Sequence, residues 1–79
     1  MARRNWRSCL RWVHYSHGVS MLLANEQLVG GVTLHDGRWN NWIIGCPTAG
    51  ADPKRGTAMR KLRRRVVRIV DACLEVKRG

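Results

Sequence analysis

Apolar residues in the last third of the chain recur at the spacing of an α-helix. Starting at Met59 they follow one another at intervals of three, four, three, four and three positions. This spacing places them on one face of a helix for about five turns, which outweighs the strand-like character of the β-branched stretch VVRIV. The sequence therefore predicts a helix over residues 57–77, whose core-facing residues are Met59, Leu62, Val66, Ile69 and Cys73.

Residues 18–45 predict an antiparallel β-meander with strands near 19–24, 28–35 and 38–44. Asp36-Gly37 stands between two β-favourable runs and indicates a two-residue type I′ turn, because that turn needs positive φ at both central positions. Such a turn fixes the register, so Trp42 lies across from Gly31 and covers its bare backbone. The predicted pairs on one side are Leu34 with Trp39 and Val32 with Asn41, and those on the other are His35 with Arg38 and Thr33 with Asn40.

The segments on either side of the meander are less determined. Residues 1–17 fit a helix, because Trp6, Cys9, Leu10 and Val13 share a helical face, or a strand, because RWVHYS is aromatic and β-branched. We favour a strand that pairs with residues 19–24 through a turn near 17–18. Residues 46–56 contain both prolines and predict a loop. The helix after it has two candidate starts, Asp52-Pro53 and Thr57.

These elements predict one α+β domain over residues 1–79, with a three- to four-stranded meander packed on one long C-terminal helix. A chain of 79 residues has a thin core. Its apolar stretches are too short for a membrane span and its start lacks the apolar region of a signal peptide, so we expect a cytoplasmic protein. Cys9, Cys46 and Cys73 form an odd set without CxxC spacing, and we expect them to be reduced and buried.

Positive charge is the strongest compositional signal, with 15 Lys and Arg against five acids and a net charge of +10. Such a balance favours nucleic acid or acidic protein surfaces as partners. Arg60, Arg64 and Arg68 stack like charges at helical spacing, and the bases crowd the half of the helix where its dipole favours acids. The predicted partner-binding residues are Arg55, Arg60, Lys61, Arg63, Arg64 and Arg68, with Arg38 and Trp42 on the strands.

Catalysis and metal binding have little support. The five acids are scattered, and the three histidines have no Ser or Cys partner at a motif spacing. His14 and His17 beside Cys9 and Cys46 provide a single close ligand pair, whereas structural zinc sites usually have two. We therefore expect no enzyme activity, no metal and no cofactor, and we expect a monomer while leaving a dimer open.

Two stretches carry resemblances. KRGTAMRK (54–61), at the start of a C-terminal helix that follows strands, resembles the phosphate-gripping helix of double-stranded-RNA-binding domains. GGVTLHDGRWNNWIIG followed by TAMRKLRRRVV, over residues 30–67, resembles small orphan proteins of phages and prophages, some of which are anti-CRISPR inhibitors. The second resemblance implies a non-catalytic inhibitor that blocks a host Cas-type nucleoprotein complex through the Arg-rich surface. The alternative is a direct DNA- or RNA-binding protein with low sequence specificity.

Overall fold

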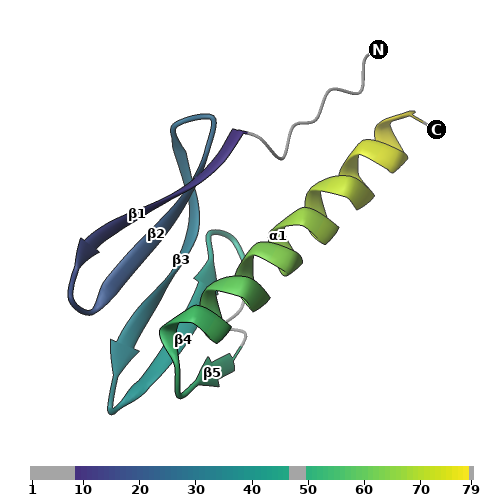
Figure 1. The fold of residues 1–79 in the computed structure, drawn as a ribbon. Helices are drawn as coiled ribbons and strands as arrows, with labels where there is room; N and C mark the ends of the chain where they lie inside the picture. Colours follow the sequence, from purple (N-terminus) through teal and green to yellow (C-terminus); the bar gives the residue numbers. More distant parts are fainter. Residues whose placement is uncertain (1–8, 47–49, 79) are drawn as a thin grey trace.

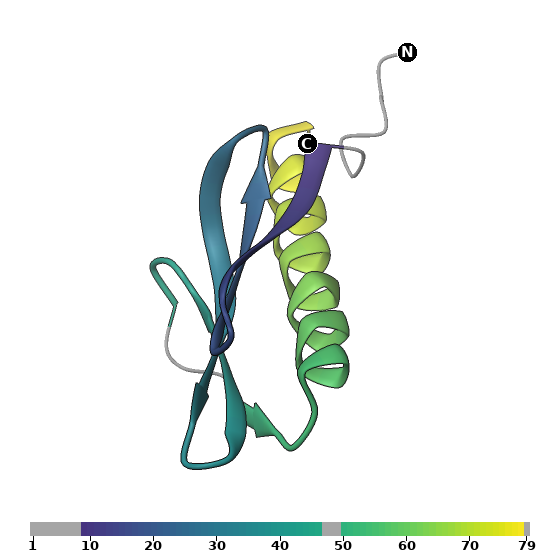
Figure 2. The same ribbon diagram turned by 60° about the vertical axis from the view of Figure 1, so that its left-hand side comes forward.

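A five-stranded antiparallel sheet packs one of its faces against a single long helix (Figures 1 and 2). The computed structural model describes residues 9–46 and 50–78. The strands follow one another in the sheet in chain order, which confirms the predicted α+β fold and adds a fifth strand. The elements are β1 (Leu10–Ser16), β2 (Val19–Ala24), β3 (Gln27–His35), β4 (Arg38–Ile43), β5 (Gly50–Asp52) and α1 (Arg55–Arg78). No helix in the described ranges is long and apolar enough to span a membrane.

The β3–β4 hairpin has the predicted turn and register. Asp36 and Gly37 have φ values of 52° and 74°, as a type I′ turn requires. All the predicted pairs are present, including Gly31 opposite Trp42. A Cβ atom at Gly31 would lie 2.6 Å from Trp42 Cζ2, so only glycine leaves room for the indole. Trp42 Nε1 donates a hydrogen bond of 2.9 Å to Thr33 Oγ1, which fixes the ring on the sheet.

The first described element is a strand, which decides between the two alternatives for the N-terminal segment. β1 pairs antiparallel with β2 from Leu10 opposite Ala24 onward, and a turn at residues 17–18 joins the two strands. Trp6, part of the alternative helical stripe, lies outside the described residues. Cross-strand pairing of an aromatic and β-branched segment therefore prevails over its helical spacing.

The predicted loop over residues 46–56 is partly wrong. It contains β5, which pairs with β4 from Trp39 opposite Asp52 to Asn41 opposite Gly50, and it also contains the start of α1. Neither candidate cap is used, because Asp52 belongs to β5 and the first helical hydrogen bond runs from the Ala58 amide to the Lys54 carbonyl at 3.1 Å. The helix is also longer than predicted at both ends.

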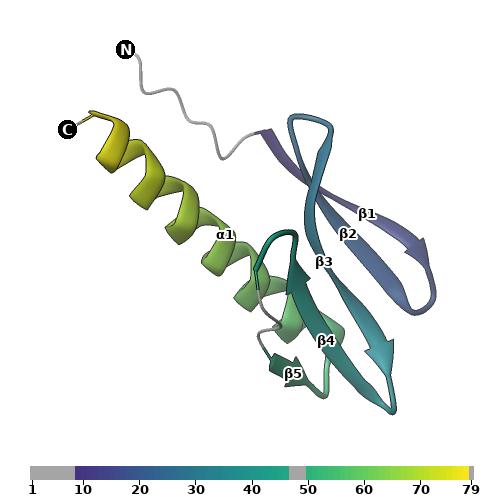
Figure 3. The same cartoon turned by 180° about the vertical axis from the view of Figure 1, so that it is seen from behind.

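The core lies between α1 and the face of the sheet that carries Leu22, Val32, Trp39 and Ile43. Its buried side chains are those four with Ala58, Leu62 and Val66 from α1. The rest of the predicted helical stripe is less buried: Met59 packs against the core half-buried, Ile69 is 38% exposed and Cys73 is exposed. Figures 1 and 3 show the reason, since the C-terminal half of α1 extends past β4 and β5. The prediction of buried cysteines is wrong for Cys9 as well, and Cys46 is half-buried.

The β2–β3 turn places a non-glycine residue in an unfavourable conformation. Asn25 and Glu26 have φ values of 53° and 65°, so both central positions are left-handed. The Glu26 carboxylate accepts two hydrogen bonds from Arg11, of 2.8 and 2.7 Å. This pairing lowers the pKa of Glu26 and raises that of Arg11. The Arg11–Glu26 ion pair therefore contributes its full stabilisation at pH values above the ordinary pKa of a glutamate. This contribution is lost as the pH falls through the lowered pKa of Glu26.

We expect a Glu26→Gly variant to melt about 4–8 °C above a Glu26→Ala variant. The left-handed conformation costs a residue with a Cβ atom about 1 kcal/mol more than it costs glycine. A difference of about 1 kcal/mol shifts the melting temperature of a small domain by this amount. Both variants lack the carboxylate, so the comparison isolates the backbone. Thermal unfolding followed by circular dichroism measures the difference. An alanine variant that melts at or above the glycine variant would show that the turn carries no such strain.

Candidate anion-binding surface

The cations of α1 gather on the sides of the helix that the core leaves free. We call Arg60, Lys61, Arg63, Arg64, Arg65 and Arg68 the basic surface. Arg65 is half-buried and the other five are exposed. Leu62 and Val66 turn to the core, so the helical period directs the intervening cations outward. The first turn of α1 contains no acid. The positive end of the helix dipole therefore adds to these charges instead of being neutralised.

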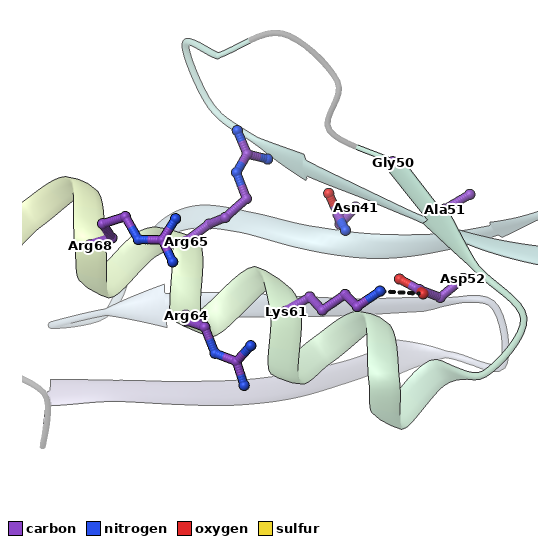
Figure 4. A pocket seen from close by; sticks show the side chains of 8 residues that line it. All are labelled: Asn41, Gly50, Ala51, Asp52, Lys61, Arg64, Arg65 and Arg68. Carbon is purple, nitrogen blue, oxygen red and sulfur yellow. Dashed lines mark hydrogen bonds and ion pairs between the residues drawn. The ribbon is translucent and has the colours of Figure 1, made fainter.

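Four members of the basic surface line a hollow between α1 and the β4–β5 edge of the sheet (Figure 4). We call it the α1–β5 hollow; its volume is about 330 Å³. The space exists because β5 is only three residues long and because Gly50, opposite Asn41, has no side chain to fill it. Its lining consists of Asn41, Gly50, Ala51, Asp52, Lys61, Arg64, Arg65 and Arg68.

The hollow is positively charged. Lys61 Nζ lies 3.0 Å from Asp52 Oδ1, so one of its four cations is neutralised by a carboxylate that is itself buried. The other three, Arg64, Arg65 and Arg68, have no carboxylate within salt-bridge distance among the residues that the structure describes. Arg64 and Arg65 leave the helix in opposite directions in Figure 4.

Two residues that line this hollow, Asn41 and Arg65, each have one buried polar atom without a hydrogen-bond partner. Asn41 is only 4% exposed, and its Oδ1 is unpaired. Arg65 Nη1 is likewise buried without a partner. A buried polar group in this state costs about 1–3 kcal/mol, so native proteins rarely keep one without a reason. Both atoms are shielded from solvent, so this unused hydrogen-bonding capacity lies behind the accessible surface of the hollow.

Arg55, one of the predicted partner-binding residues, points into the protein. Its guanidinium carbon lies 4.9 Å from the centre of the Trp39 ring, and its Nη1 donates to Ser20 Oγ at 3.3 Å. Ser20 Oγ lies 2.8 Å from His14 Nδ1, so the network joins β1, β2 and the start of α1. The Ser20–His14 pair has the composition of a catalytic dyad, but Ser20 is fully buried. In this arrangement no substrate reaches the hydroxyl, and the network stabilises the fold.

The two predicted strand residues lie on the opposite face of the sheet from α1. Trp42 is half-buried there and belongs to an apolar row across the strands, in which Val13 pairs with Met21 while Met21 and Trp42 flank Gly31. Arg38 is exposed, and its Nη2 donates a 3.4 Å hydrogen bond to the Ala51 carbonyl. The predicted set therefore divides between two faces and the core. Only Lys61, Arg64 and Arg68 meet at the hollow.

Sequence reasoning missed Asn41 and Arg65 as site residues. A signal for Asn41 was present, because the hairpin register places this polar side chain opposite Val32 in the row that faces the core. Arg65 follows Lys61 by four positions and precedes Arg68 by three, so all three share a helix face. No group of three or more His, Cys, Asp or Glu side chains within 9–46 and 50–73 could hold a metal ion.

No protein-family model, no curated protein and no solved structure matches this chain.

Proposed function

We propose that the protein is a non-enzymatic binding protein that docks on the phosphate backbone of DNA or RNA through the basic surface of α1. The observation that carries the proposal is the run of five arginines, Arg60, Arg63, Arg64, Arg65 and Arg68, without a neutralising carboxylate among the described side chains. Guanidinium groups bind phosphate oxygens in a bidentate manner and keep their charge at any physiological pH.

The arrangement opposes the stability of the isolated protein, and this supports a role in binding. Arg60 with Arg64 and Arg64 with Arg68 are like-charge pairs four residues apart, each of which destabilises a helix by about 0.2–0.5 kcal/mol. Arg60 and Arg64 also lie in the first half of α1, nearer the end of the helix at which the dipole is unfavourable to cations. A surface selected only for solubility would interleave acids. Features that lower stability without a local gain are expected where a protein meets its partner.

A second candidate is the phage-type inhibitor, which would bind a host Cas-type nucleoprotein complex rather than free nucleic acid. The observation that favours it is the apolar row of Val13, Met21 and Trp42 on the face of the sheet opposite α1. Phosphate contacts have no use for such a row, whereas a protein partner can bury it. In this candidate, the basic surface and the open sheet face contact different parts of the complex.

A salt series tests the first candidate. With about six phosphate contacts, affinity for a 20-base-pair duplex or a 20-nucleotide single strand should fall by about 10³-fold between 50 and 200 mM salt, with little dependence on sequence. Fluorescence anisotropy measures it. Absence of binding at 50 mM salt would exclude free nucleic acid as the partner. In that case, capture of Cas subunits from a nuclease-treated lysate supports the inhibitor, and capture of none counts against both candidates.

A further inference from the structure

We infer that Trp42 is a stacking platform for a nucleobase, so that the protein binds single-stranded nucleic acid in preference to a duplex. This second contact rests on the proposed function and goes beyond it, because it lies on the face of the sheet opposite α1 and selects one class of nucleic acid. The ligand is an unpaired base of DNA or RNA, and stacking accepts any base because every base has a flat π-face.

The indole of Trp42 lies flat on the sheet. The ring is attached to β4 and reaches across to β3, where it meets two residues of the same face. Its Nε1 donates a 2.9 Å hydrogen bond to Thr33 Oγ1. Its Cζ2 and Cε2 lie over Gly31, within 2.6 and 3.1 Å of the position that a Cβ atom would take there. The ring therefore spans two strands in one direction and follows β3 in the other, so its plane runs along the sheet.

The outer face of this ring is open to a ligand. Its inner face rests on Gly31, the only kind of residue that leaves room for it. Trp42 is half-buried, so solvent still reaches the ring, and it does so from the side away from the sheet. No cation of the described residues lies over it, since the cation–ring pair among them is Arg55 on Trp39 at the other face of the sheet.

The surroundings of Trp42 favour a nucleobase as the occupant. Met21 continues the apolar plane beyond Gly31, while Thr33 and Asn40 place polar groups beside it. A base has the same make-up, with apolar faces and hydrogen-bonding edges. Charge decides against a second copy of the chain, because two chains of net charge +10 repel each other whereas a nucleic acid is attracted. A ring that lies flush with the sheet also differs from the pocket-filling anchor typical of protein interfaces.

One single strand can reach both the basic surface and Trp42. β5 is the edge strand of the sheet and is three residues long. The α1–β5 hollow lies on one side of β5, and β4, which carries Trp42, is its neighbour in the sheet (Figure 3). A flexible single strand can cross so short an edge and lay one base on the indole. A duplex cannot, because it is stiff and its bases are stacked on one another.

The test compares three fluorescein-labelled probes of equal length by fluorescence anisotropy at the low end of the salt series. They are an oligothymidylate, a strand with the same phosphates but abasic throughout, and a duplex. We expect the oligothymidylate to bind about tenfold more tightly than the abasic strand. Trp42→Leu should weaken oligothymidylate binding about tenfold, to the level of the abasic strand, and leave the other two probes unchanged.

Trp42→Phe is the matched control. Both variants lose the indole N–H and with it the hydrogen bond to Thr33, but only phenylalanine keeps an aromatic face. We expect Trp42→Phe to bind oligothymidylate at least about fivefold more tightly than Trp42→Leu. Urea denaturation verifies that both variants are folded. Equal affinities of two folded variants would show that the ring face makes no contact, and would overturn the inference.

The unmodified protein provides a readout that needs no variant. Stacking of a base changes the magnetic surroundings of the indole, so the Trp42 indole N–H signal in proton–nitrogen NMR should shift when oligothymidylate is added. The abasic strand should leave this signal in place, because its phosphates bind on the other side of the sheet. Shifts of equal size with both strands would contradict the stacking of a base.

Failure of the platform is distinguishable from failure of the proposed function. If all three probes bind alike and Trp42→Leu changes none of them, the protein docks on phosphates and Trp42 stacks no base. If none of the probes binds, both proposals fail. If Trp42→Leu abolishes capture of Cas subunits, or turns a dimer into a monomer in sedimentation equilibrium, and leaves oligothymidylate binding intact, a protein covers this face and the inference is overturned.

Discussion

A Leu62→Ala variant is expected to lose about 3 kcal/mol of unfolding free energy, which is much of the stability available to a domain of this size. Leu62 is fully buried between α1 and the sheet, where it belongs to the same core as Val32, Trp39 and Ile43. A core built from so few large side chains has little capacity to fill the cavity. Urea denaturation followed by Trp fluorescence measures the loss.

Ile69→Ala is the matched control, because Ile69 belongs to the same apolar stripe two turns further along α1 but is 38% exposed. We expect it to cost less than about 1 kcal/mol, since truncating a partly exposed side chain at the surface leaves no closed cavity. The ratio of the two losses therefore reports where the sheet stops covering the helix. Equal losses would show that the stripe is buried along its whole length in solution.

The β3–β4 hairpin was predictable because every rule that sets it is local. Asp36-Gly37 determines the turn, the turn determines the register, and the register places Trp42 on Gly31. The burial of the helix was only half predictable for the opposite reason. Spacing identifies the face that is apolar, but the length of the sheet beneath it decides how far that face is covered, and this depends on contacts distant in sequence.

The candidate site was less predictable than the fold. Charge and helical spacing correctly placed Arg60, Arg63, Arg64 and Arg68 on the outside of α1. They could not show that Arg55 turns inward onto Trp39, because that depends on where the helix begins. The hollow itself arises from β5, a three-residue strand inside a proline-containing segment, and so short a strand has almost no pattern of its own.

The second large effect is expected from Arg64→Glu, which should weaken nucleic-acid binding by tens of fold at 50 mM salt. The change removes a cation from the centre of the basic surface and places an anion beside Arg60 and Arg68. A lost or repelled phosphate contact should also make the plot of log binding constant against log salt concentration less steep, by about 1 or more. Fluorescence anisotropy over the salt series measures both quantities.

The same substitution should stabilise the fold, which separates a binding defect from unfolding. The introduced carboxylate would lie four residues from Arg60 and from Arg68, so two repulsive pairs become attractive and the free energy of unfolding should rise by about 1 kcal/mol. Arg38→Glu is the matched control, because it makes the same change in net charge on the other face of the sheet. If both variants weaken binding equally, attraction depends on net charge alone and α1 is not the docking surface. If only Arg64→Glu weakens binding while it raises the urea midpoint, the arginine row is retained for its partner at the expense of the helix that carries it.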